Sequence, residues 1–380
     1  MNKKKNICLF STSRSDYYLL SLISKQFEKS KKINFTFVAT GNHFDKNKGN
    51  TYKAINKDNI KINYKIPFNL KDSQSGNIIN SIQKSFPKIK DVLKKAKTDL
   101  VFILGDRYEL LPISITALLL NIPIAHVHGG EITEGAFDDS IRHAVTKFSN
   151  LHFVCNEIYK KRVIQLGENP SLVYNVGGIG AEIIKNNKLL SREFLIKKLK
   201  INDNKKIILV ALHPETNDIN QNFNGMFKSL SKLSNLYNII FTSPNSDPGC
   251  ELIEKQIFKF NKKYDSKCIK NLGSELFHSV VARSEFIIGN SSSGLLEAPI
   301  LKTPTINIGD RQKGRLKANS VFDCISNEKS ITKTINIVIK KNFISFKNIY
   351  YQDKKASKKI VNIINKIDLK KIKIKKFYDI

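Results

Sequence analysis

Short, mostly apolar runs alternate with amphipathic segments along almost the whole chain, and this alternation is the strongest constraint on its fold. Leu100–Leu104, Leu151–Cys155 and Phe286–Gly289 are each short enough for a single strand, and each is followed by a segment with helical spacing of its apolar residues. Apolar strands separated by helices are typical of a parallel sheet covered on both faces. The sequence therefore predicts an α/β fold.

The length and one break in the pattern predict two domains. A chain of 380 residues is longer than one hydrophobic core usually organises. The segment NVGGIGAE at 175–182 interrupts the alternation, which resumes at Ile207–Leu212, and we interpret it as a hinge. We predict two Rossmann-like domains of similar size that face each other across a cleft. The predicted parts are residues 1–178, residues 179–349, and a C-terminal helix and tail at 350–380.

The net charge of +31 raises the question of a polyanionic partner. Basic residues are spread along the chain, and the dense runs, Lys3–Lys5 and Lys370–Lys376, lie near its two ends. No aromatic residues are interleaved with a basic patch, as a nucleic-acid platform requires. We therefore expect no nucleic-acid and no membrane partner. The alternative, a non-catalytic protein that binds acidic polymers, predicts steeply salt-dependent binding.

The cysteines and the N-terminal residues bear on localisation. The five cysteines are scattered and form no C-x-x-C pair, which favours reduced thiols over a zinc or redox motif. The apolar stretch near the N-terminus is too short for a signal peptide, and no run is long enough to span a bilayer. We expect a cytoplasmic protein.

Carboxylates gather where predicted strands end and helices begin. Asp106 and Arg107 directly follow Leu100–Leu104, while Glu131 and Asp138 follow the next strand along the chain. The carboxyl ends of parallel strands meet at one sheet edge, where ligands bind. These carboxylates are therefore candidates to share a proton or to divide acid and base roles. The alternative is that an aspartate caps its helix, and we expect Asp139 to do so.

The histidines invite a metal interpretation that the spacing does not complete. His126 and His128 alternate on a predicted strand and would share one face, with Glu131 three residues further on. No other set of residues has ligand spacing that completes a site, so we predict no metal. We expect His126 to be a satisfied strand histidine. His213 follows a strand of the second domain and faces the cleft, where a neutral imidazole can transfer a proton.

The segment GNSSSGLLEAP at 289–299 is the most specific motif of the second half. Small residues let backbone N–H groups approach a phosphate, and the N-terminus of a helix predicted at 294–301 adds positive potential. The motif lacks the lysine of an ATPase loop, so it predicts a diphosphate site without ATPase chemistry. Glu297 is placed to bind a ribose, and Arg311 and Arg315 to balance the phosphate charge.

Taken together, these motifs resemble the UDP-N-acetylglucosamine 2-epimerase family in its hydrolysing branch. The resemblance covers nearly the whole chain, and its strength lies in the order and spacing of the motifs. They are STSRSDY, GDRYE, HGGE, DDSIRH, NVGGIGAE, HPET, GNSSSG and NIGDRQKGR. It implies the two-domain arrangement of GT-B glycosyltransferases. The nucleotide is then expected mainly on the C-terminal domain, with the final helix crossing back onto the first.

The resemblance also implies a mechanism. A base removes the C2 proton of the sugar while the nucleoside diphosphate leaves C1, which gives a glycal, and hydrolysing members then add water. The implied acid–base residues are Asp106, Glu131, Asp138 and His213. The implied nucleotide-sugar contacts are Arg14, Arg107, Asn245, Ser291, Ser292, Ser293, Glu297 and Arg311. No cofactor is implied, and we expect a homodimer or homotetramer.

The hydrolysing branch is favoured because the strand ends HVHGGE rather than H-V-E-A-G and Leu19 stands roughly where other members carry a lysine. The expected substrate is UDP-N-acetylglucosamine, releasing N-acetylmannosamine for sialic acid synthesis. The alternative is a UDP- or GDP-linked 2,4-diacetamido-2,4,6-trideoxyglucose for legionaminic acid synthesis. Loops at 41–76 and 133–137 are expected to form the pocket that distinguishes them. A glycosyltransferase of the same architecture is a further alternative.

Overall fold

The chain forms two compact units in a computed structural model. The described residues are 4–44, 50–68, 75–134, 137–214, 223–244, 249–269, 272–341, 346, 349–350 and 355–380. The first unit comprises Met1–Ile132, Phe137–Glu182 and Gln352–Ile380, and the second comprises Thr133–Ala136 and Ile183–Tyr351. Among the described residues, no helix is both long and apolar enough to cross a membrane.

The first unit is built on a seven-stranded sheet in the order β3-β2-β1-β4-β5-β6-β7, with every pair parallel. The strands are β1 (Lys5–Ser11), β2 (Ile33–Gly41), β3 (Tyr64–Pro67), β4 (Leu100–Leu104), β5 (Ile124–Val127), β6 (Leu151–Val154) and β7 (Val173–Asn175). The strand order reverses between β1 and β4. Ligands of open parallel sheets bind at such a reversal, outside the carboxyl ends of the strands.

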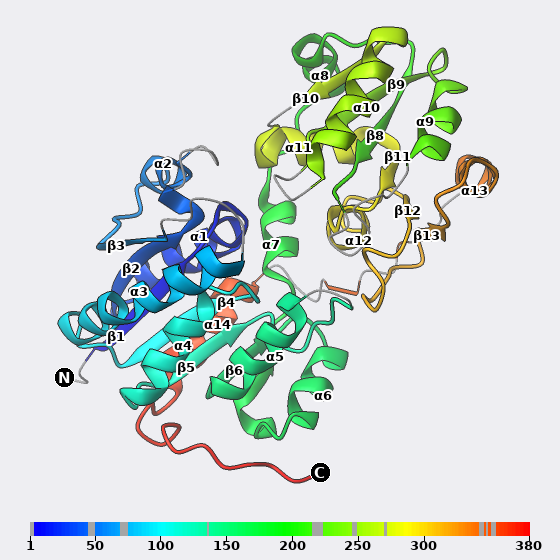
Figure 1. The fold of residues 1–380 in the computed structure, drawn as a ribbon. Helices are drawn as coiled ribbons and strands as arrows, with labels where there is room; N and C mark the ends of the chain where they lie inside the picture. The colour runs from blue at the N-terminus through cyan, green and yellow to red at the C-terminus, as the bar shows by residue number, and fades with distance from the viewer. Residues whose placement is uncertain are drawn as a thin grey trace. The chain divides into compact units, whose positions relative to one another are not determined.

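Helices cover both faces of this sheet (Figure 1). They are α1 (Arg14–Lys29), α2 (Tyr52–Lys57), α3 (Ser75–Lys95), α4 (Leu110–Leu119), α5 (Phe137–Phe148), α6 (Glu157–Gln165), α7 (Ile179–Asn186) and α14 (Ala356–Lys366), with 3-10 turns η1 (Asn42–Phe44) and η2 (Pro170–Leu172). One core packs residues of α3, α4 and α5, such as Leu93, Ile113 and Val145, against the strands. On α1, Phe27 packs edge-on against Phe102 of β4 with ring centroids 5.3 Å apart.

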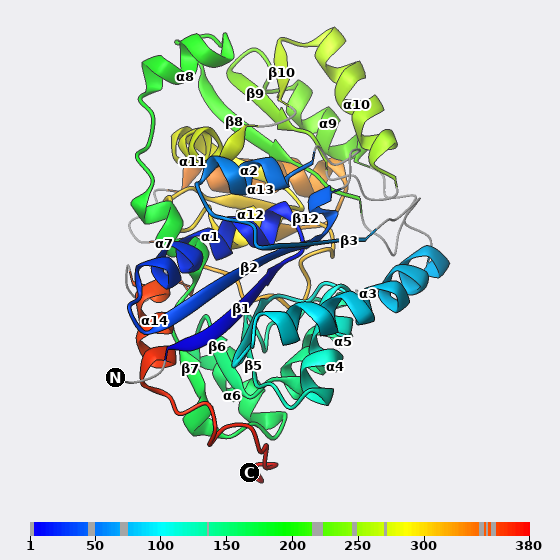
Figure 2. The ribbon, with the colours of Figure 1, turned by 90° about the vertical axis from the view of Figure 1, so that its left-hand side faces the viewer.

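Helix α14, from the far end of the chain, lies beside α1 in the first unit (Figure 2). The ammonium group of Lys5 donates to the carbonyl oxygens of Ile364 and Ile367 at the end of this helix, each at 2.6 Å. At its start, the backbone N–H and hydroxyl of Ser357 both donate to Glu182. Polar contacts at both ends therefore fix a helix that otherwise packs through its apolar face.

The second unit has a six-stranded parallel sheet in the order β10-β9-β8-β11-β12-β13. Its strands are β8 (Lys206–Ala211), β9 (Tyr237–Thr242), β10 (Ser266–Ile269), β11 (Ser284–Gly289), β12 (Thr305–Ile308) and β13 (Val321–Cys324). Its helices are α8 (Arg192–Leu199), α9 (Asn224–Ser231), α10 (Cys250–Lys263), α11 (Gly273–Arg283), α12 (Ser293–Leu296) and α13 (Glu328–Lys340). One face packs against α9, α10 and α13, and the other against α8 and α11.

The predicted α/β class with two parallel sheets is confirmed, but several elements differ from the prediction. Residues 41–76, expected to be long loops, contain η1, α2 and β3. Helix α8 and the strands β10 and β13 were not predicted. Helix α12 has four residues rather than the eight expected at 294–301. Within the segment interpreted as a hinge, α7 begins at Ile179, and the boundary between the units falls after Glu182, inside this helix.

Candidate functional site

Arg142 is the organising residue of the carboxyl edge of the first unit. It lies on α5 and is only 2% exposed. Its Nη1 donates to the backbone oxygen of Glu131 at 2.9 Å and to Oδ1 of Asp139 at 3.0 Å, and its Nη2 pairs with Asp106. One buried guanidinium thus joins the ends of β4 and β5 to the first turn of α5. Arg142 thereby links the Asp106 side chain to the backbone of Glu131, two residues that the sequence predicted at one sheet edge.

Asp138 lies in the first turn of α5, beside this network. Burial, reinforced by the negative charge of Asp106, raises the pKa of its carboxyl to about 6. A carboxyl group that titrates near neutral pH is suited to proton transfer in either direction. The neighbouring Asp139, expected to be a helix cap, lies in the same turn and contacts Arg142 and, at 3.4 Å, His143.

The raised pKa makes Asp138 a source of pH-dependent instability. In the unfolded chain the pKa of an aspartate is near 3.9. Between about pH 4 and pH 6 the unfolded state therefore binds fewer protons than the folded state, so raising the pH through this range favours unfolding. Asp138→Asn should therefore raise the free energy of unfolding at pH 7 by roughly 1–2 kcal/mol, a figure reduced for partial exposure. Urea unfolding at pH 4 and pH 7 tests this, because the gain should vanish at pH 4. Asp91→Asn, at an exposed position of α3, is the control. An equal gain at both pH values would contradict the prediction.

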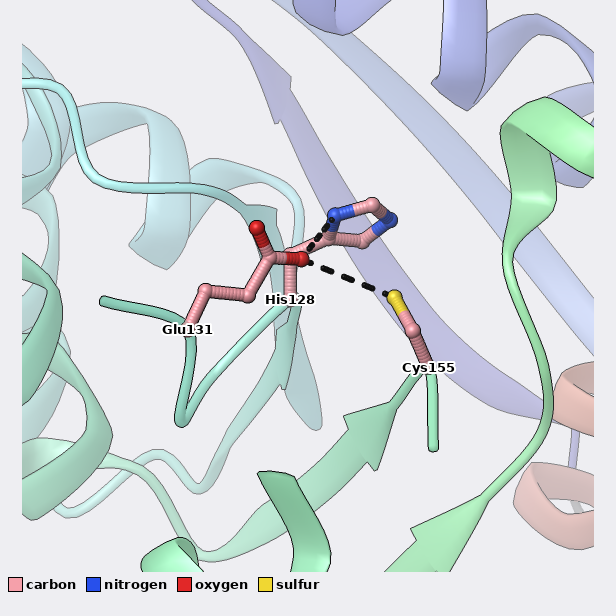
Figure 3. Close-up of side chains that lie close together, drawn as sticks. All are labelled: His128, Glu131 and Cys155. Atoms are coloured by element: carbon pink, nitrogen blue, oxygen red, sulfur yellow. Dashed lines mark hydrogen bonds and ion pairs between the residues drawn. The ribbon is translucent and has the colours of Figure 1, made fainter. Parts of the chain in front are cut away.

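His128, Glu131 and Cys155 form a compact cluster at the same edge (Figure 3). Nδ1 of His128 lies 2.9 Å from Oε1 of Glu131, and the sulfur of Cys155 lies 3.6 Å from the same oxygen. Burial disfavours the imidazolium, but the acidic groups of Cys155 and Glu131 raise the pKa of His128 well above its ordinary value. Burial raises the pKa of the Cys155 thiol. Cys155 was not a predicted site residue, because only the pairing of β5 with β6 brings it to Glu131.

The expectation that His126 and His128 share one face is wrong. Strand β5 ends at Val127, and His128 adopts a left-handed backbone conformation with φ of 68°. His126 is fully buried, and its Nε2 lies 2.7 Å from the carbonyl oxygen of Gly105. Burial lowers the pKa of His126 to about 3. It is the satisfied strand histidine that the sequence predicted.

The predicted arginines of the first unit occupy different environments. Arg107 donates from Nε and Nη2 to both oxygens of Glu109, at 3.1 and 2.8 Å, and Glu109 is fully buried. Arg14 is exposed at the first residue of α1. The backbone N–H groups of Thr12 and Ser13 beside it donate to Asp16. An anion at this turn would therefore bind the Arg14 side chain, since a carboxylate of the chain already holds these N–H groups.

In the second unit, His213 lies at the reversal of strand order, where β8 neighbours β11. Asn290 fixes its backbone: the Asn290 oxygen accepts from the His213 N–H and the Asn290 amide donates to the His213 carbonyl, both at 2.8 Å. Nε2 of His213 lies 3.3 Å from the hydroxyl of Ser291. Burial and the charge of Arg311 lower the pKa of His213 to about 3. The imidazole is therefore neutral at pH 7.

The serine-rich segment after β11 forms a tight turn at this edge. Gly289 has a φ of 143°, and a Cβ there would lie 2.0 Å from the carbonyl oxygen of Ala211, so only glycine fits. The hydroxyls of Ser291 and Ser293 lie 2.9 Å apart, and Ser292 precedes α12 as its N-cap residue. Because α12 has only four residues, its dipole is weaker than expected, and a diphosphate would depend on local N–H groups and on arginine.

Glu297 and Arg311 are both held in place around this turn. Oε2 of Glu297 lies 3.4 Å from Nε2 of His278, a buried residue whose Nδ1 accepts from the amide of Asn187 at 2.9 Å. Since Nδ1 accepts, the proton of a neutral His278 resides on Nε2, which faces the carboxylate. Nη1 of Arg311 donates to the Asn290 carbonyl oxygen at 3.2 Å.

Two further predicted contacts to the nucleotide sugar are Arg315 and Asn245. Arg315, expected beside the phosphates, donates to the hydroxyl of Thr133 at 3.3 Å. Asn245 lies outside the described residues. Sequence reasoning did not identify Asn290, His278 or Gln312, which donates to the Asn290 carbonyl at 2.9 Å. Asn290 lies within the GNSSSG motif and Gln312 within the NIGDRQKGR motif, and these motifs were the available signals. His278 is recognisable only from the fold.

Comparisons with known proteins identify the family of the chain. A family model described as UDP-N-acetylglucosamine 2-epimerase matches residues 25–365. The GDP/UDP-N,N'-diacetylbacillosamine 2-epimerase (hydrolyzing) of Campylobacter jejuni is 40% identical over 329 residues, which are 86% of this chain and 85% of that protein. Polysialic acid biosynthesis protein P7 of Escherichia coli is 35% identical over 384 residues, covering 99% of this chain and 98% of that protein.

A solved structure shows the same fold. The UDP-GlcNAc 2-epimerase from Neisseria meningitidis, bound to UDP-GlcNAc, matches with a TM-score of 0.77 at 18% identity, over 95% of this chain and 99% of that one. The family model and the two relatives extend over most of the chain, through both units. The chain therefore belongs to the UDP-N-acetylglucosamine 2-epimerase family and is an enzyme of its hydrolysing branch.

Proposed function

We propose that this enzyme hydrolyses a nucleotide-linked 2-acetamido sugar with inversion at C2 and releases the free manno-configured sugar and the nucleoside diphosphate. The observation that carries the proposal is that buried Arg142 binds both the Asp106 carboxylate and the backbone oxygen of Glu131, next to Asp138 with its pKa near 6. Inverting C2 requires one group that removes a proton and another that returns it on the opposite face. Three carboxylates at one edge satisfy that requirement.

In this proposal each unit has its own task. Asp106, Glu131 and Asp138 of the first unit carry the proton transfers of elimination, water addition and reprotonation. In the second unit, the turn at Ser291–Ser293 and the guanidinium of Arg311 hold the diphosphate. His213, neutral at pH 7, then acts through hydrogen bonds to the departing phosphate.

The first substrate that we propose is UDP- or GDP-linked N,N'-diacetylbacillosamine, a 2,4-diacetamido-2,4,6-trideoxy sugar. Its support is the name of the Campylobacter jejuni relative at 40% identity. The second candidate is UDP-N-acetylglucosamine, for sialic acid synthesis. It is supported by the relative named for polysialic acid biosynthesis, whose match extends over 99% of this chain. Both substrates require the same chemistry at C1 and C2, so the groups at C4 and C6 decide between them.

An NMR time course in deuterated water tests the proposal with each nucleotide sugar separately. The expected result is a free manno-sugar that carries deuterium at C2, together with the nucleoside diphosphate. The substrate with the larger kcat/KM is the preferred one. Failure to convert any of these nucleotide sugars would refute the proposal, and transfer of the sugar to an added acceptor without free manno-sugar would favour a glycosyltransferase.

Arg311→Met provides a separate prediction about binding. The substitution removes a charge-assisted contact to the diphosphate, so KM should rise roughly 10–100-fold, with a smaller change in kcat. The control is Arg192→Met, which removes a half-buried arginine paired with Asp203. Steady-state kinetics of both variants test the prediction. A fall in kcat with KM unchanged would contradict the binding role of Arg311.

A further inference from the structure

The cluster of His128, Glu131 and Cys155 offers three chemically different metal ligands in one place: an imidazole nitrogen, a carboxylate oxygen and a sulfur. These donor atoms all lie within 4.8 Å of one another. Zinc–ligand bonds of about 2.0–2.3 Å place neighbouring ligands of a tetrahedral site roughly 3.4–3.6 Å apart. The measured separations of 2.9 Å from nitrogen to oxygen and 3.6 Å from sulfur to oxygen are close to that spacing.

The backbone holds the three ligands in position independently of one another. His128 follows β5 in a left-handed conformation, and Cys155 follows β6, which pairs with β5. Gly130, between the two other ligands, approaches so closely that a Cβ there would lie 2.5 Å from the Tyr159 carbonyl oxygen. The loop that carries Glu131 is thus packed against α6. Little rearrangement is needed for all three donors to bind one ion.

The kind of ion follows from the donor set. Sulfur and imidazole donors suit zinc and cadmium, whereas magnesium and calcium require several oxygen ligands. The Cys155 residue is 2% exposed, but the side chains of His128 and Glu131 retain 19% and 12% exposure, so an ion can enter from their side. Nε2 of His128 is also buried without a hydrogen-bond partner among the described residues. The imidazole is therefore not tied down through its second nitrogen.

We propose that His128, Glu131 and Cys155 form an inhibitory site for a thiophilic divalent cation such as Zn²⁺ or Cd²⁺. Binding converts the thiol of Cys155 to a thiolate and the imidazolium of His128 to an imidazole that binds through Nδ1, and both protons are released to solvent. The fourth position is filled by water. Because Glu131 then coordinates the ion, it can no longer transfer a proton. This inhibition rests on the proposed function of Glu131, whereas binding of the ion does not.

Cadmium titration of the full chain tests binding without any measurement of turnover. The parent protein carries Cys250→Ser and Cys268→Ser, which remove the two cysteines that are not buried. The expected result is about one Cd²⁺ per chain, with a thiolate-to-cadmium absorption band in the ultraviolet. Adding Cys155→Ser should abolish the band. It should also weaken Cd²⁺ binding by more than the roughly 10–100-fold loss of affinity that follows removal of a group that only supports a metal ligand. Mg²⁺ should not compete.

A second variant and an activity assay complete the test. Glu131→Gln in the same parent should retain the band but bind more weakly, which separates loss of a ligand from loss of folding. A band that survives Cys155→Ser, or no binding by the parent, would overturn the site. Zn²⁺ should inhibit turnover by the parent protein, and a chelator should restore its activity. The Cys155→Ser variant should be much less sensitive to Zn²⁺, when each rate is compared with the metal-free rate of the same protein. Binding without inhibition would overturn the inhibitory role alone, and binding by a protein that turns over no nucleotide sugar would contradict only the proposed function.

Discussion

Replacing Glu131 with Gln is expected to lower kcat by about 10²–10⁴-fold, the usual contribution of a positioned acid or base. The amide keeps the size of the side chain and can still accept a hydrogen bond from His128, so local packing is preserved. It cannot exchange a proton with C2 of the sugar. Because the loss concerns proton transfer, KM should change little. Steady-state kinetics with the better of the two proposed substrates measure both constants.

The control for this prediction is Glu157→Gln at the start of α6. This exposed glutamate accepts from the amide of Asn175 at 2.7 Å, a contact that glutamine can keep. Its kcat should match that of the unaltered enzyme. If Glu131→Gln also retained kcat to within about a factor of ten, the assignment of Glu131 as a proton-transfer residue would be wrong.

Arg142→Met is expected to reduce the free energy of unfolding by about 3–5 kcal/mol, the typical cost of removing one partner of a buried ion pair. Methionine fills much of the same volume but leaves Asp106 and Asp139 without their shared counter-charge. It also leaves the Glu131 carbonyl oxygen without this donor. Urea unfolding at pH 7, followed by circular dichroism, measures the loss.

Two further variants show whether the loss of stability in Arg142→Met comes from the removed charge. Lys25→Met removes an exposed ion pair with Asp58 at 3.9 Å and should cost no more than about 1 kcal/mol. The double variant Asp106→Asn/Arg142→Met should lose less than the sum of the two single losses, because the neutral amide that replaces the Asp106 carboxylate no longer needs the guanidinium. Additive losses would show that Arg142 stabilises the edge by packing rather than by charge.

The sequence predicted the fold class because strand and helix periodicities are local properties. Leu100–Leu104 has the bounds expected from its apolar run alone. One missed strand did carry a local signal: in β3 (YKIP), Tyr64 and Ile66 alternate with Lys65 and Pro67, and the strand pairs with the edge of β2. By contrast, β10 contains lysine and serine, and its pairing with β9 defines it.

The candidate site was predictable to the extent that its residues directly follow strands. Asp106, Glu131 and His213 were identifiable because the carboxyl ends of parallel strands converge. The connections among them were not, since nothing local indicates that Arg142 is buried or that Cys155 reaches Glu131. Asp138 and Asp139 are adjacent and chemically alike, and the environment of each became clear only from its neighbours.

The return of α14 to the first unit has a consequence for biosynthesis. Lys5 leaves the ribosome long before Ile364 and Ile367, whose carbonyl groups it binds and which are made only after the whole second unit. The second unit can complete its core during translation, whereas the first must wait, with the apolar surface of α1 that α14 covers still open to solvent. A nascent chain stalled before residue 356 should therefore be a preferred target for chaperones, although the carboxylates that we propose to transfer protons have already been synthesised.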